Sequence, residues 1–368
     1  MKTTAILTEH RARNHGSCLQ AYALQESLRD LGYACEIIDY RPRAVEDTFG
    51  VFIKSLHREC GRNPKRLAMF YANTLLFSPL RIRREWKFAR YRKEMYRLSR
   101  RHFETLTPAL AKELTYDAYV CGSDQIWNPR ITKGMDPLYF AAPFDPQARK
   151  VSYAASIGLS ALEEKDAADL VRLLEPMDTV TVREPSAQRL IASLCDKPVE
   201  VVLDPTLLID PTRWQQLITT RRPVNKDYIL VYSLKVDDHM IAYANRLSRE
   251  TGLPVLFFDL RRRYGKHSIS KYTADPIEFL RYLQDARYVV TNSFHGTVFS
   301  VLFQKQFVCV PMEGTSSRMV DLLEKVGLSH RLLGDDLDID APIDYRPVQA
   351  ILEAERQRCR RLLQEAIG

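Results

Sequence analysis

Short apolar runs rich in β-branched residues alternate with stretches of helical periodicity along nearly the whole chain. This alternation is typical of βα units, in which helices cover the faces of a parallel sheet. The first series of predicted strands comprises Thr4–Leu7, Cys35–Asp39, Tyr116–Cys121, Val151–Ala155, Thr179–Val182 and Val199–Leu203. The second series comprises Tyr228–Tyr232, Val255–Phe258, Tyr288–Thr291 and Phe307–Val310. Two Rossmann-like domains are predicted, because the chain has 368 residues and single cores stop growing at roughly 250–300 residues.

The turns at Asp204-Pro205 and Asp210-Pro211 lie where one series gives way to the next. We therefore predict an N-terminal domain over residues 1–210 and a C-terminal domain over residues 211–345. Helices are predicted over Leu19–Leu31, Ser186–Leu194, Met240–Thr251, Ile277–Asp285, Thr297–Phe303 and Met319–Val326. Residues 346–368 read as one amphipathic helix, which fits either a simple terminal helix or one that packs back on the first domain.

Positive charge is concentrated in one segment. Between Lys54 and Arg101 there are 15 Lys and Arg against three Glu, a balance of +12, so the rest of the chain carries 8 − 12 = −4. We predict a basic helical insertion over residues 54–104 within the N-terminal domain, which is expected to bind the acceptor, while the C-terminal domain is expected to bind the donor. Its aromatic and aliphatic residues fit a helix lying on an anionic membrane, and a solvated helix face is the alternative. Nucleic acid is not expected, because no base-reading module accompanies the charge.

The start of the chain lacks the apolar core of a secretory signal, and no stretch reaches the roughly 20 apolar residues of a membrane span. We expect a cytoplasmic protein, with peripheral attachment to the inner face of the membrane as a possible role of the basic segment. The seven cysteines lie at least 17 positions apart, which fits neither zinc-binding pairs nor a disulfide framework. No metal site and no redox cofactor are expected.

Four strand-to-helix junctions carry candidate site residues, because ligands collect beyond the carboxyl ends of parallel strands. The first is Asn14-His15-Gly16-Ser17, where a glycine allows close backbone approach and Asn14 or Ser17 can cap the next helix. A plain capped helix start explains these residues equally well.

The second junction is the loop Gly122-Ser123-Asp124-Gln125-Ile126-Trp127-Asn128-Pro129. It offers a sugar an indole for its apolar face and Asp124 as an acceptor of a hydroxyl proton. Ser123, Gln125 and Asn128 add polar contacts. The alternatives are that Asp124 caps a helix and that Trp127 belongs to the core.

The third junction places Arg183 at the end of an apolar strand, where a guanidinium can hold a carboxylate or phosphate at two points. An internal ion pair with Glu184 or another acid is as good a reading.

The fourth junction is Thr291-Asn292-Ser293-Phe294-His295-Gly296-Thr297. A histidine at a helix amino terminus can bind an anion or move a proton near neutral pH, and a structural histidine is the alternative. Downstream, Gly314-Thr315-Ser316-Ser317-Arg318 could form a further phosphate cradle, with Ser317 and Arg318 as contacts, or a small-residue loop with an incidental arginine.

Taken in order, these segments resemble the polysaccharide pyruvyl transferase family. The likeness rests on NHGSCLQAYAL, YVCGSDQIWNP, SYAASIG, VREPSA, VLDPTLL and TNSFHGTVFSVLFQKQFV. It implies an α/β fold with two Rossmann-like domains facing across a cleft, similar to GT-B glycosyltransferases. It also implies transfer of the enolpyruvyl group of phosphoenolpyruvate to a sugar as a cyclic ketal with release of phosphate. A membrane-bound basic segment would bring the cleft to a lipid-linked sugar, so we expect a lipid-linked acceptor.

The resemblance implies that Arg183 and His295 meet the donor, one from each domain. In several members Arg-Leu precedes the histidine, whereas Ser293-Phe294 stand there in this chain, so Arg318 or the Asn14–Ser17 loop is expected to replace the missing cation. We expect Arg183 to bind the donor, His295 to act as general acid and Asp124 as general base, with no cofactor beyond phosphoenolpyruvate as co-substrate. A GT-B nucleotide-sugar glycosyltransferase and a non-catalytic membrane module are the rival interpretations.

Overall fold

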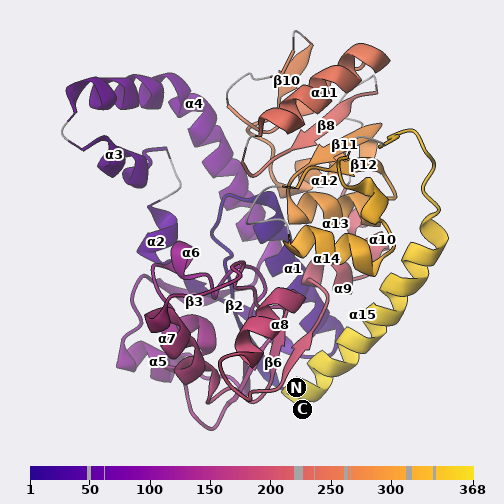
Figure 1. The fold of residues 1–368 in the computed structure, drawn as a ribbon. Helices are drawn as coiled ribbons and strands as arrows, with labels where there is room; N and C mark the ends of the chain where they lie inside the picture. Colours follow the sequence, from indigo (N-terminus) through magenta and orange to yellow (C-terminus); the bar gives the residue numbers. More distant parts are fainter. Residues whose placement is uncertain are drawn as a thin grey trace. The chain divides into compact units, whose positions relative to one another are not determined.

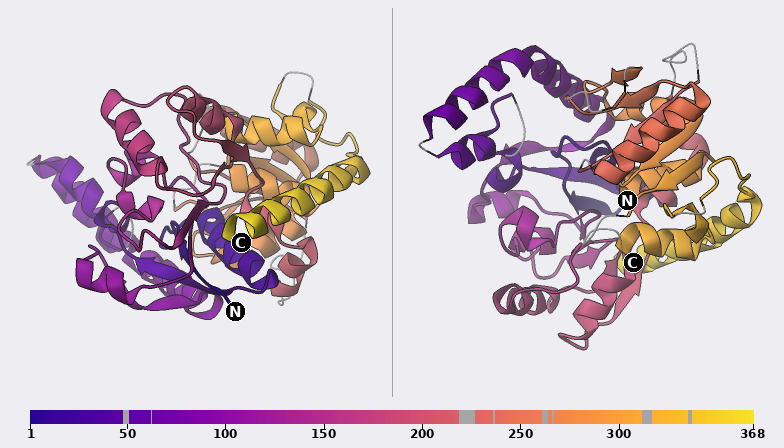
Figure 2. Two further views of the ribbon diagram at one scale, coloured as in Figure 1. Left: turned by 90° about the horizontal axis from the view of Figure 1, so that it is seen from below. Right: turned by 45° about the horizontal axis from the view of Figure 1, so that its top comes forward.

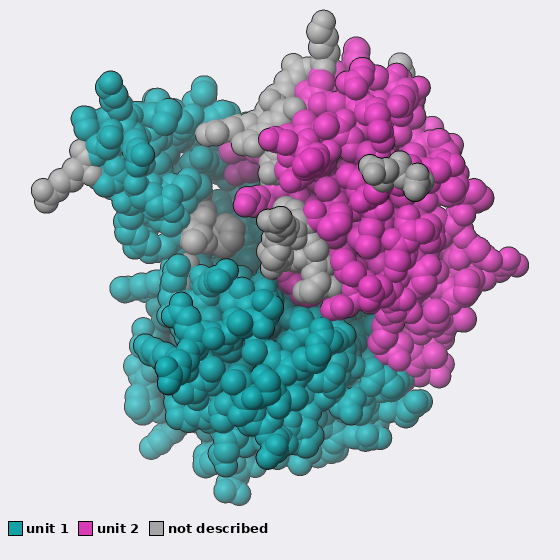
Figure 3. All heavy atoms as spheres, in the orientation of Figure 1, with its two compact units in different colours: residues 1–208, 358–368 teal, residues 209–357 magenta. Residues whose placement is uncertain are grey.

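The structure is a computed structural model that describes residues 1–47, 51–61, 63–218, 227–235, 237–260, 264–265, 267–311, 317–334 and 337–368. The chain forms two compact units, shown in different colours in Figure 3. Unit 1 comprises residues 1–208 and 358–368, and unit 2 comprises residues 209–357. The order of helices and strands can be followed in Figure 1.

The sheet of unit 1 is parallel throughout, with the strand order β3-β2-β1-β4-β5. Single parallel bridges, Val151 to Thr179 and Ala155 to Val182, continue it to the pair β6-β7. The bounds are β1 Thr3–Leu7, β2 Ala34–Tyr40, β3 Leu98–Phe103, β4 Ala118–Cys121, β5 Arg149–Ser152, β6 Val180–Val182 and β7 Val199–Val201. The strand order reverses between β1 and β4, and ligands of open α/β sheets bind at such a reversal.

Helices and apolar strand residues form the core of unit 1, because parallel strands must be covered on both faces. Buried members of one cluster include Ala5, Cys121, Trp127 and Val182. The helices are α1 His15–Asp30, α2 Arg43–Glu46, α3 Lys54–Cys60, α4 Pro64–Met95, α5 Pro108–Glu113, α6 Pro129–Thr132, α7 Glu164–Leu174, α8 Pro185–Ala192 and α9 Pro205–Leu208, with a 3₁₀ turn, η1, over Pro137–Phe140.

The basic segment 54–104 is helical only in part, which corrects the prediction of a helical insertion. After α3 and α4, residues 98–103 form the edge strand β3, which pairs with β2. Its Arg100, Arg101 and His102 are exposed, while Ser99 and Phe103 face the core. Charged side chains on an edge strand discourage pairing with other chains. They also explain why β3 was not predicted, since strands were predicted from apolar runs.

Helix α4 is 32 residues long and buries only Phe70, Phe88, Tyr91 and Arg92. Large apolar side chains are exposed along its length, including Leu75 at 79%, Leu76 at 69% and Trp86 at 60%. No helix among the described residues combines the length and apolar character that a membrane span requires.

The sheet of unit 2 repeats this arrangement with the parallel order β10-β9-β8-β11-β12, so the order reverses between β8 and β11. The strands are β8 Ile229–Tyr232, β9 Val255–Phe257, β10 Ser268–Ser270, β11 Tyr288–Thr291 and β12 Gln306–Cys309. The helices are α10 Pro211–Leu217, α11 Asp238–Thr251, α12 Pro276–Asp285, α13 Phe294–Leu302 and α14 Ser317–Lys325, with a second 3₁₀ turn, η2, over Ser329–Arg331. Each of the ten predicted strands overlaps a strand of the structure, whereas the edge strands β3, of six residues, and β10, of three, were not predicted.

The last helix, α15 (Tyr345–Ile367), begins in unit 2, and its residues from Arg358 onward belong to unit 1. There the Cys359 thiol accepts a hydrogen bond from the Leu203 backbone N–H at 3.3 Å, and Arg358 donates to the Val201 carbonyl at 2.6 Å. The two chain ends lie side by side in unit 1 (Figure 2), where Lys2 contacts the carbonyl of Gly368.

Candidate active site

Polar residues gather at the carboxyl ends of the strands in unit 1, around the guanidinium of Arg183. This side chain follows β6 and is 1% exposed. Its Nη1 donates to Asp204 Oδ2 at 2.9 Å, its Nη2 lies 3.7 Å from Asp124 Oδ1, and its Nε lies 3.8 Å from Glu184 Oε2. The predicted loop after β4 and the predicted arginine after β6 are therefore brought together.

The carboxylates around Arg183 are themselves held in place. Glu184 accepts hydrogen bonds from the Ser156 hydroxyl at 2.7 Å and from the backbone N–H groups of Ile157 and Gly158, each at 3.2 Å. Although burial lowers the pKa of the Arg183 guanidinium, the charges of the three carboxylates raise its pKa overall. Of the two readings of Arg183, the structure shows the internal ion pair. An anionic ligand could reach this guanidinium only by taking the place of a carboxylate.

Asp124 is the carboxylate that a substrate can reach most easily, because its side chain is 16% exposed, whereas those of Glu184 and Asp204 are 1% and 0% exposed. Its backbone lies in the left-handed region with φ of 73°, an unusual conformation for a residue with a side chain. A parallel bridge to Ala155 holds it there. Residues kept in such conformations cluster at functional sites.

Trp127 does not form a sugar platform, contrary to one of its two predicted roles. Its side chain is fully buried, its ring stacks on Phe140 at 4.9 Å, and its Nε1 donates to the Tyr139 carbonyl at 3.1 Å. The indole belongs to the core of unit 1, in the cluster that also contains Cys121 and Val182. The core alternative was the right one.

Other residues of this loop organise it. Asn128 caps α6 by accepting from the Arg130 N–H at 3.0 Å, and it donates to Gln125 Oε1 at 2.8 Å. The Ser123 hydroxyl donates to Asp204 Oδ2 at 3.2 Å. A Cβ at Gly158 would lie 2.2 Å from Gln125 Oε1. The loop that contains Gly158 can therefore pack this closely against Gln125 only because position 158 is a glycine.

The Asn14–Ser17 junction is a capped helix start, as one of its two readings proposed. Asn14 Oδ1 accepts from the N–H groups of Gly16 at 2.9 Å and Ser17 at 3.3 Å. The Ser17 hydroxyl donates to the Glu9 carbonyl at 2.8 Å. His15 is 2% exposed, and its ring lies 5.4 Å from that of Phe88. The amide and hydroxyl that were predicted to meet a substrate are thus engaged with backbone groups.

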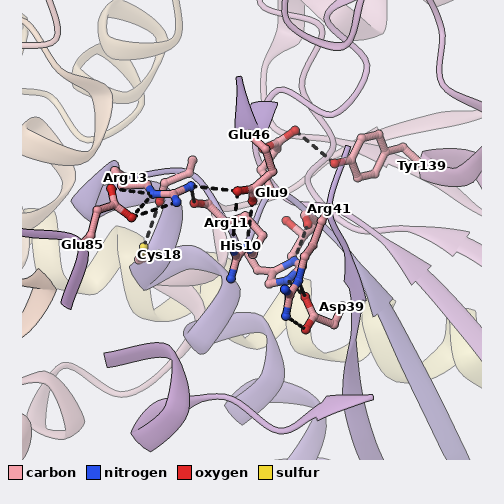
Figure 4. Close-up of polar contacts among 12 residues, drawn as sticks. Glu9, His10, Arg11, Arg13, Cys18, Asp39, Arg41, Glu46, Glu85 and Tyr139 are labelled. Carbon is pink, nitrogen blue, oxygen red and sulfur yellow. Dashed lines mark hydrogen bonds and ion pairs between the residues drawn. The ribbon is translucent and has the colours of Figure 1, made fainter. Parts of the chain in front are cut away.

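Glu9 is a candidate that sequence reasoning missed. It follows β1, directly at the reversal of strand order, and its Oε1 accepts a hydrogen bond from the Tyr139 hydroxyl at 3.0 Å (Figure 4). Burial raises the pKa of the Glu9 carboxyl to about 8, and the charge of Asp124 adds to this effect. An acid that stays protonated near neutral pH beside an accessible carboxylate is a possible proton donor or acceptor. Its position two residues after the first strand was the signal available in the sequence.

In unit 2, the predicted residues of the fourth junction lie together at the reversal between β8 and β11. Asn292 Nδ2 donates to the Lys235 carbonyl at 2.7 Å, and its Oδ1 accepts from the Leu234 N–H at 3.1 Å, so it joins the loops that follow both strands. Ser293 caps α13 by accepting from the Gly296 N–H at 3.4 Å. His295 stands in the first turn of α13 and is 7% exposed.

Gly296 is required by the packing of α13 on the strand before it. A Cβ at this position would lie 2.2 Å from Thr291 Oγ1 and 3.0 Å from a ring carbon of Tyr232. The close approach fixes the start of α13, and with it His295, against the end of β11. Phe294 is half-buried, with its ring 5.3 Å from that of His295.

The downstream junction is described in part. Residues 314–316 lie outside the described residues, and α14 begins at Ser317. Arg318 stands half-buried in its first turn.

Unit 2 also contains an open cavity of about 660 Å³. It is lined by Asp237, His239, Ala242, Tyr243, Arg246, Arg249, Val310, Pro311, Leu333 and Gly334, none of which is a predicted site residue. In the part of the chain that the structure describes, no group of three His, Cys, Asp or Glu side chains is arranged to hold a metal ion.

Comparisons with known proteins were made for the sequence and for the fold. A family model described as polysaccharide pyruvyl transferase matches residues 14–313. No curated relative matches the sequence. Among solved structures, the S. aureus protein MnaA in its co-structure with UDP has a TM-score of 0.53 and 10% identity over 97% of this chain and 88% of its own.

Two further structures are similar. The UDP-GlcNAc 2-epimerase of Methanocaldococcus jannaschii has a TM-score of 0.52 and 11% identity, covering 96% of this chain and 92% of its own. The glycosyltransferase SnogD of Streptomyces nogalater has a TM-score of 0.45 and 14% identity over 100% of both chains. At such identities the likeness concerns the fold alone. The likeness to MnaA and to the M. jannaschii epimerase, together with the two parallel sheets, confirms the predicted fold class of an α/β protein with two Rossmann-like domains.

Proposed function

The chain belongs to the polysaccharide pyruvyl transferase family, and from this premise we propose that it transfers the enolpyruvyl group of phosphoenolpyruvate to a sugar of a lipid-linked glycan precursor. The product is a pyruvate ketal, and phosphate is released. Besides the family, one observation carries the proposal: a histidine stands at the start of α13, beyond the carboxyl end of β11, in a segment without acidic residues. Such a position favours a negatively charged donor.

His295 is proposed as the general acid of the reaction. It delivers a proton either to the methylene carbon of the donor, which makes C2 electrophilic, or to the leaving phosphate. Imidazole suits this step because its ordinary pKa lies near neutral pH. The helix dipole of α13 stabilises the charge of the donor in the same place.

Asp124 is proposed as the base that accepts a proton from an acceptor hydroxyl. Two hydroxyls of one sugar attack C2 in turn, and the two protons that they lose end on the new methyl carbon and on the released phosphate. Asp124 is the accessible carboxylate of its cluster. Glu9 supplies a second carboxyl group, whose pKa is raised in part by the charge of Asp124. Carboxylates accept hydrogen bonds from neutral sugar hydroxyls, which suits an acceptor sugar beside Asp124.

Arg183 is proposed to contact the donor carboxylate by exchanging Asp124 for it. Asp124 is the partner that is easiest to replace, because it is 3.7 Å from the guanidinium and is the most exposed of the three. The bond to Asp204 at 2.9 Å would keep the guanidinium oriented during the exchange. An exchange of this kind would also free Asp124 to act as a base.

A lipid-linked acceptor is proposed because α4 exposes apolar side chains among cations. Each well-placed cation contributes about 1 kcal/mol to binding an anionic membrane surface. We expect the protein to float with vesicles containing phosphatidylglycerol at low salt, and Leu75→Asp with Leu76→Asp to abolish flotation. Ile269→Asp, at an apolar residue that is 40% exposed in unit 2, serves as the matched control. Flotation of the double variant at the wild-type level would remove the membrane role.

The reaction itself is tested by incubating candidate lipid-linked glycans with phosphoenolpyruvate and measuring both the mass of the glycan and free phosphate. A pyruvate adduct formed together with phosphate is the expected result. Release of UDP from a sugar nucleotide, without any adduct from phosphoenolpyruvate, would identify a nucleotide-sugar glycosyltransferase instead. No product from either donor would favour a non-catalytic module.

A further inference from the structure

Unit 1 contains a group of arginines that the proposed chemistry does not use. We call Arg11, Arg13 and Arg92 the arginine cluster: the first two lie in the loop between β1 and α1, and Arg92 lies in the last turn of α4. Figure 4 shows Arg11 and Arg13 with their acidic neighbours Glu46 and Glu85. The cluster stands beside the amino-terminal half of α1: the Cys18 thiol donates to the carbonyl of Ala12, between Arg11 and Arg13, at 3.3 Å, and the hydroxyl of Tyr91, the neighbour of Arg92, donates to the Cys18 carbonyl at 3.4 Å.

Two members of the cluster have carboxylate partners. Arg11 Nε lies 2.7 Å from Glu46 Oε1, and Arg13 Nη2 lies 2.9 Å from Glu85 Oε2. Arg13 also approaches Glu46 Oε2 at 3.6 Å. Although burial raises the pKa of Glu46, the charges of Arg11, Arg13 and Arg92 lower its pKa overall. One carboxylate thus lies near all three cations.

Arg92 differs from the other two. It is 4% exposed, and within the described ranges its guanidinium makes no ion pair, while its buried Nη1 has no hydrogen-bond partner. Burial lowers the pKa of Arg92, and the charges of Arg11 and Arg13 lower it further. A buried cation without a partner is costly, and such groups are almost always paired. The arrangement is therefore that of a site prepared for an anion.

We propose that the arginine cluster binds the phosphate or diphosphate group of the acceptor. Guanidinium groups match phosphoryl oxygens with two-point hydrogen bonds, and the dipole of α1 favours negative charge at the same end. The N–H groups of Gly16 and Ser17 already donate to Asn14, so the arginines supply the hydrogen bonds. Naming the ligand as the acceptor rests on the proposed function.

The course of α4 favours the acceptor over the donor as the source of this phosphoryl group. Arg92 lies near one end of α4, and the same helix exposes Leu75 and Leu76. These leucines precede Arg92 by 17 and 16 residues, which is about 25 Å along the helix axis. A lipid diphosphate joins an anionic group directly to an apolar chain. The same helix offers contacts for both parts.

The test measures binding of inorganic diphosphate to the full chain by calorimetry and by the shift in melting temperature, without turnover. Wild-type protein is expected to bind diphosphate and to melt at a higher temperature with it. Arg92→Met is expected to weaken binding about tenfold or more. Without ligand this variant should melt at or above the wild-type temperature, because a buried unpaired charge has been removed. Arg83→Met, at an exposed position of the same helix, is the control and should bind as wild type does.

The outcomes separate a ligand site from a structural role. If Arg92→Met melts well below wild type without ligand, or binds diphosphate as tightly as wild type, the proposal is wrong. Absence of diphosphate binding by the wild-type protein would also overturn it. Arg11→Gln, at a side chain that is 17% exposed, is an independent second variant that should also weaken diphosphate binding, and wild-type affinity in this variant would likewise count against the cluster.

Two further ligands distinguish the sources. Farnesyl diphosphate should bind more tightly than inorganic diphosphate and lose affinity in Arg92→Met, whereas phosphoenolpyruvate should bind both proteins alike. Equal loss of phosphoenolpyruvate binding would make the cluster a donor site and overturn the acceptor assignment. Since binding is measured without turnover, a protein that binds diphosphate but forms no ketal would refute the proposed function alone.

Discussion

The two five-stranded sheets share a strand order, but the groups at the carboxyl ends of their strands differ in chemistry. We call these carboxyl ends the edge in unit 1 and the edge in unit 2. At the edge in unit 1, Arg183 is enclosed by three carboxylates, and a fourth acid, Glu9, is kept protonated by burial. At the edge in unit 2, the segment from Thr291 to Thr297 brings neutral side chains and one imidazole to the start of α13. In unit 1 the carboxylates can bind hydroxyl groups, and an anion reaches Arg183 only in exchange for Asp124, whereas in unit 2 the segment 291–297 has no acidic residue to oppose an anion. Equal folds therefore do not imply equal ligands, because the loops beyond the strands decide what is bound.

The largest expected effect is on catalysis at the edge in unit 2. His295→Ala should reduce kcat/KM for pyruvyl transfer by about 10²–10⁴-fold, which is the usual contribution of a general acid. Its melting temperature should change little. The matched control is His330→Ala, at an exposed histidine of the same unit. Wild-type kcat/KM in the His295 variant would remove the proposed acid.

The edge in unit 1 should respond to substitution mainly in stability. Arg183→Met leaves Asp124, Glu184 and Asp204 without their shared cation, and loss of one partner of a buried ion pair costs about 3–5 kcal/mol. Chemical denaturation measures this free energy of unfolding. Arg189→Met, in α8 of the same unit, is the control. An unchanged free energy of unfolding would show that the ion pairs do not hold this edge together.

Glu9 offers a test through pH. Its pKa is raised from 4.5 to about 8 in the folded state, so between these values the folded state binds more protons than the unfolded state. Stability is therefore lost as pH rises, by about 1.4 kcal/mol per pH unit for this group. Glu9→Gln, which stays neutral, should remove this dependence and be the more stable protein above pH 8. Parallel curves for the two proteins between pH 5 and 8 would contradict the burial argument.

The smallest effect concerns the glycine that fixes α13. Gly296→Ala places a Cβ 2.2 Å from Thr291 Oγ1, and overpacking of this kind costs about 1–3 kcal/mol. Because α13 would shift with His295, kcat should fall as well. Gly334→Ala, where no heavy atom lies within 4 Å of the new Cβ, is the control for both readouts. Equal stability of the two variants would mean that α13 is not held at this contact.

Sequence reasoning located most of the fold because buried parallel strands read as continuous apolar runs. It missed β3, whose exposed side chains are charged, and β10, which spans only three residues. At the candidate site it selected the loops after β4, β6 and β11. It could not tell whether Trp127 faces a ligand or the core, since an indole serves both purposes and only the direction of the loop decides.

The amino-acid sequence by itself determined the two series of βα units, the basic segment and the chemical groups at the strand ends, because these depend on local periodicity and composition. The tertiary structure decided that Arg183 lies among carboxylates, that Glu9 holds its proton and that Arg92 is buried without an ion pair among the described residues. Charge pairing and burial depend on neighbours far apart in the chain. They follow from the packing of strands and helices, which no single segment specifies.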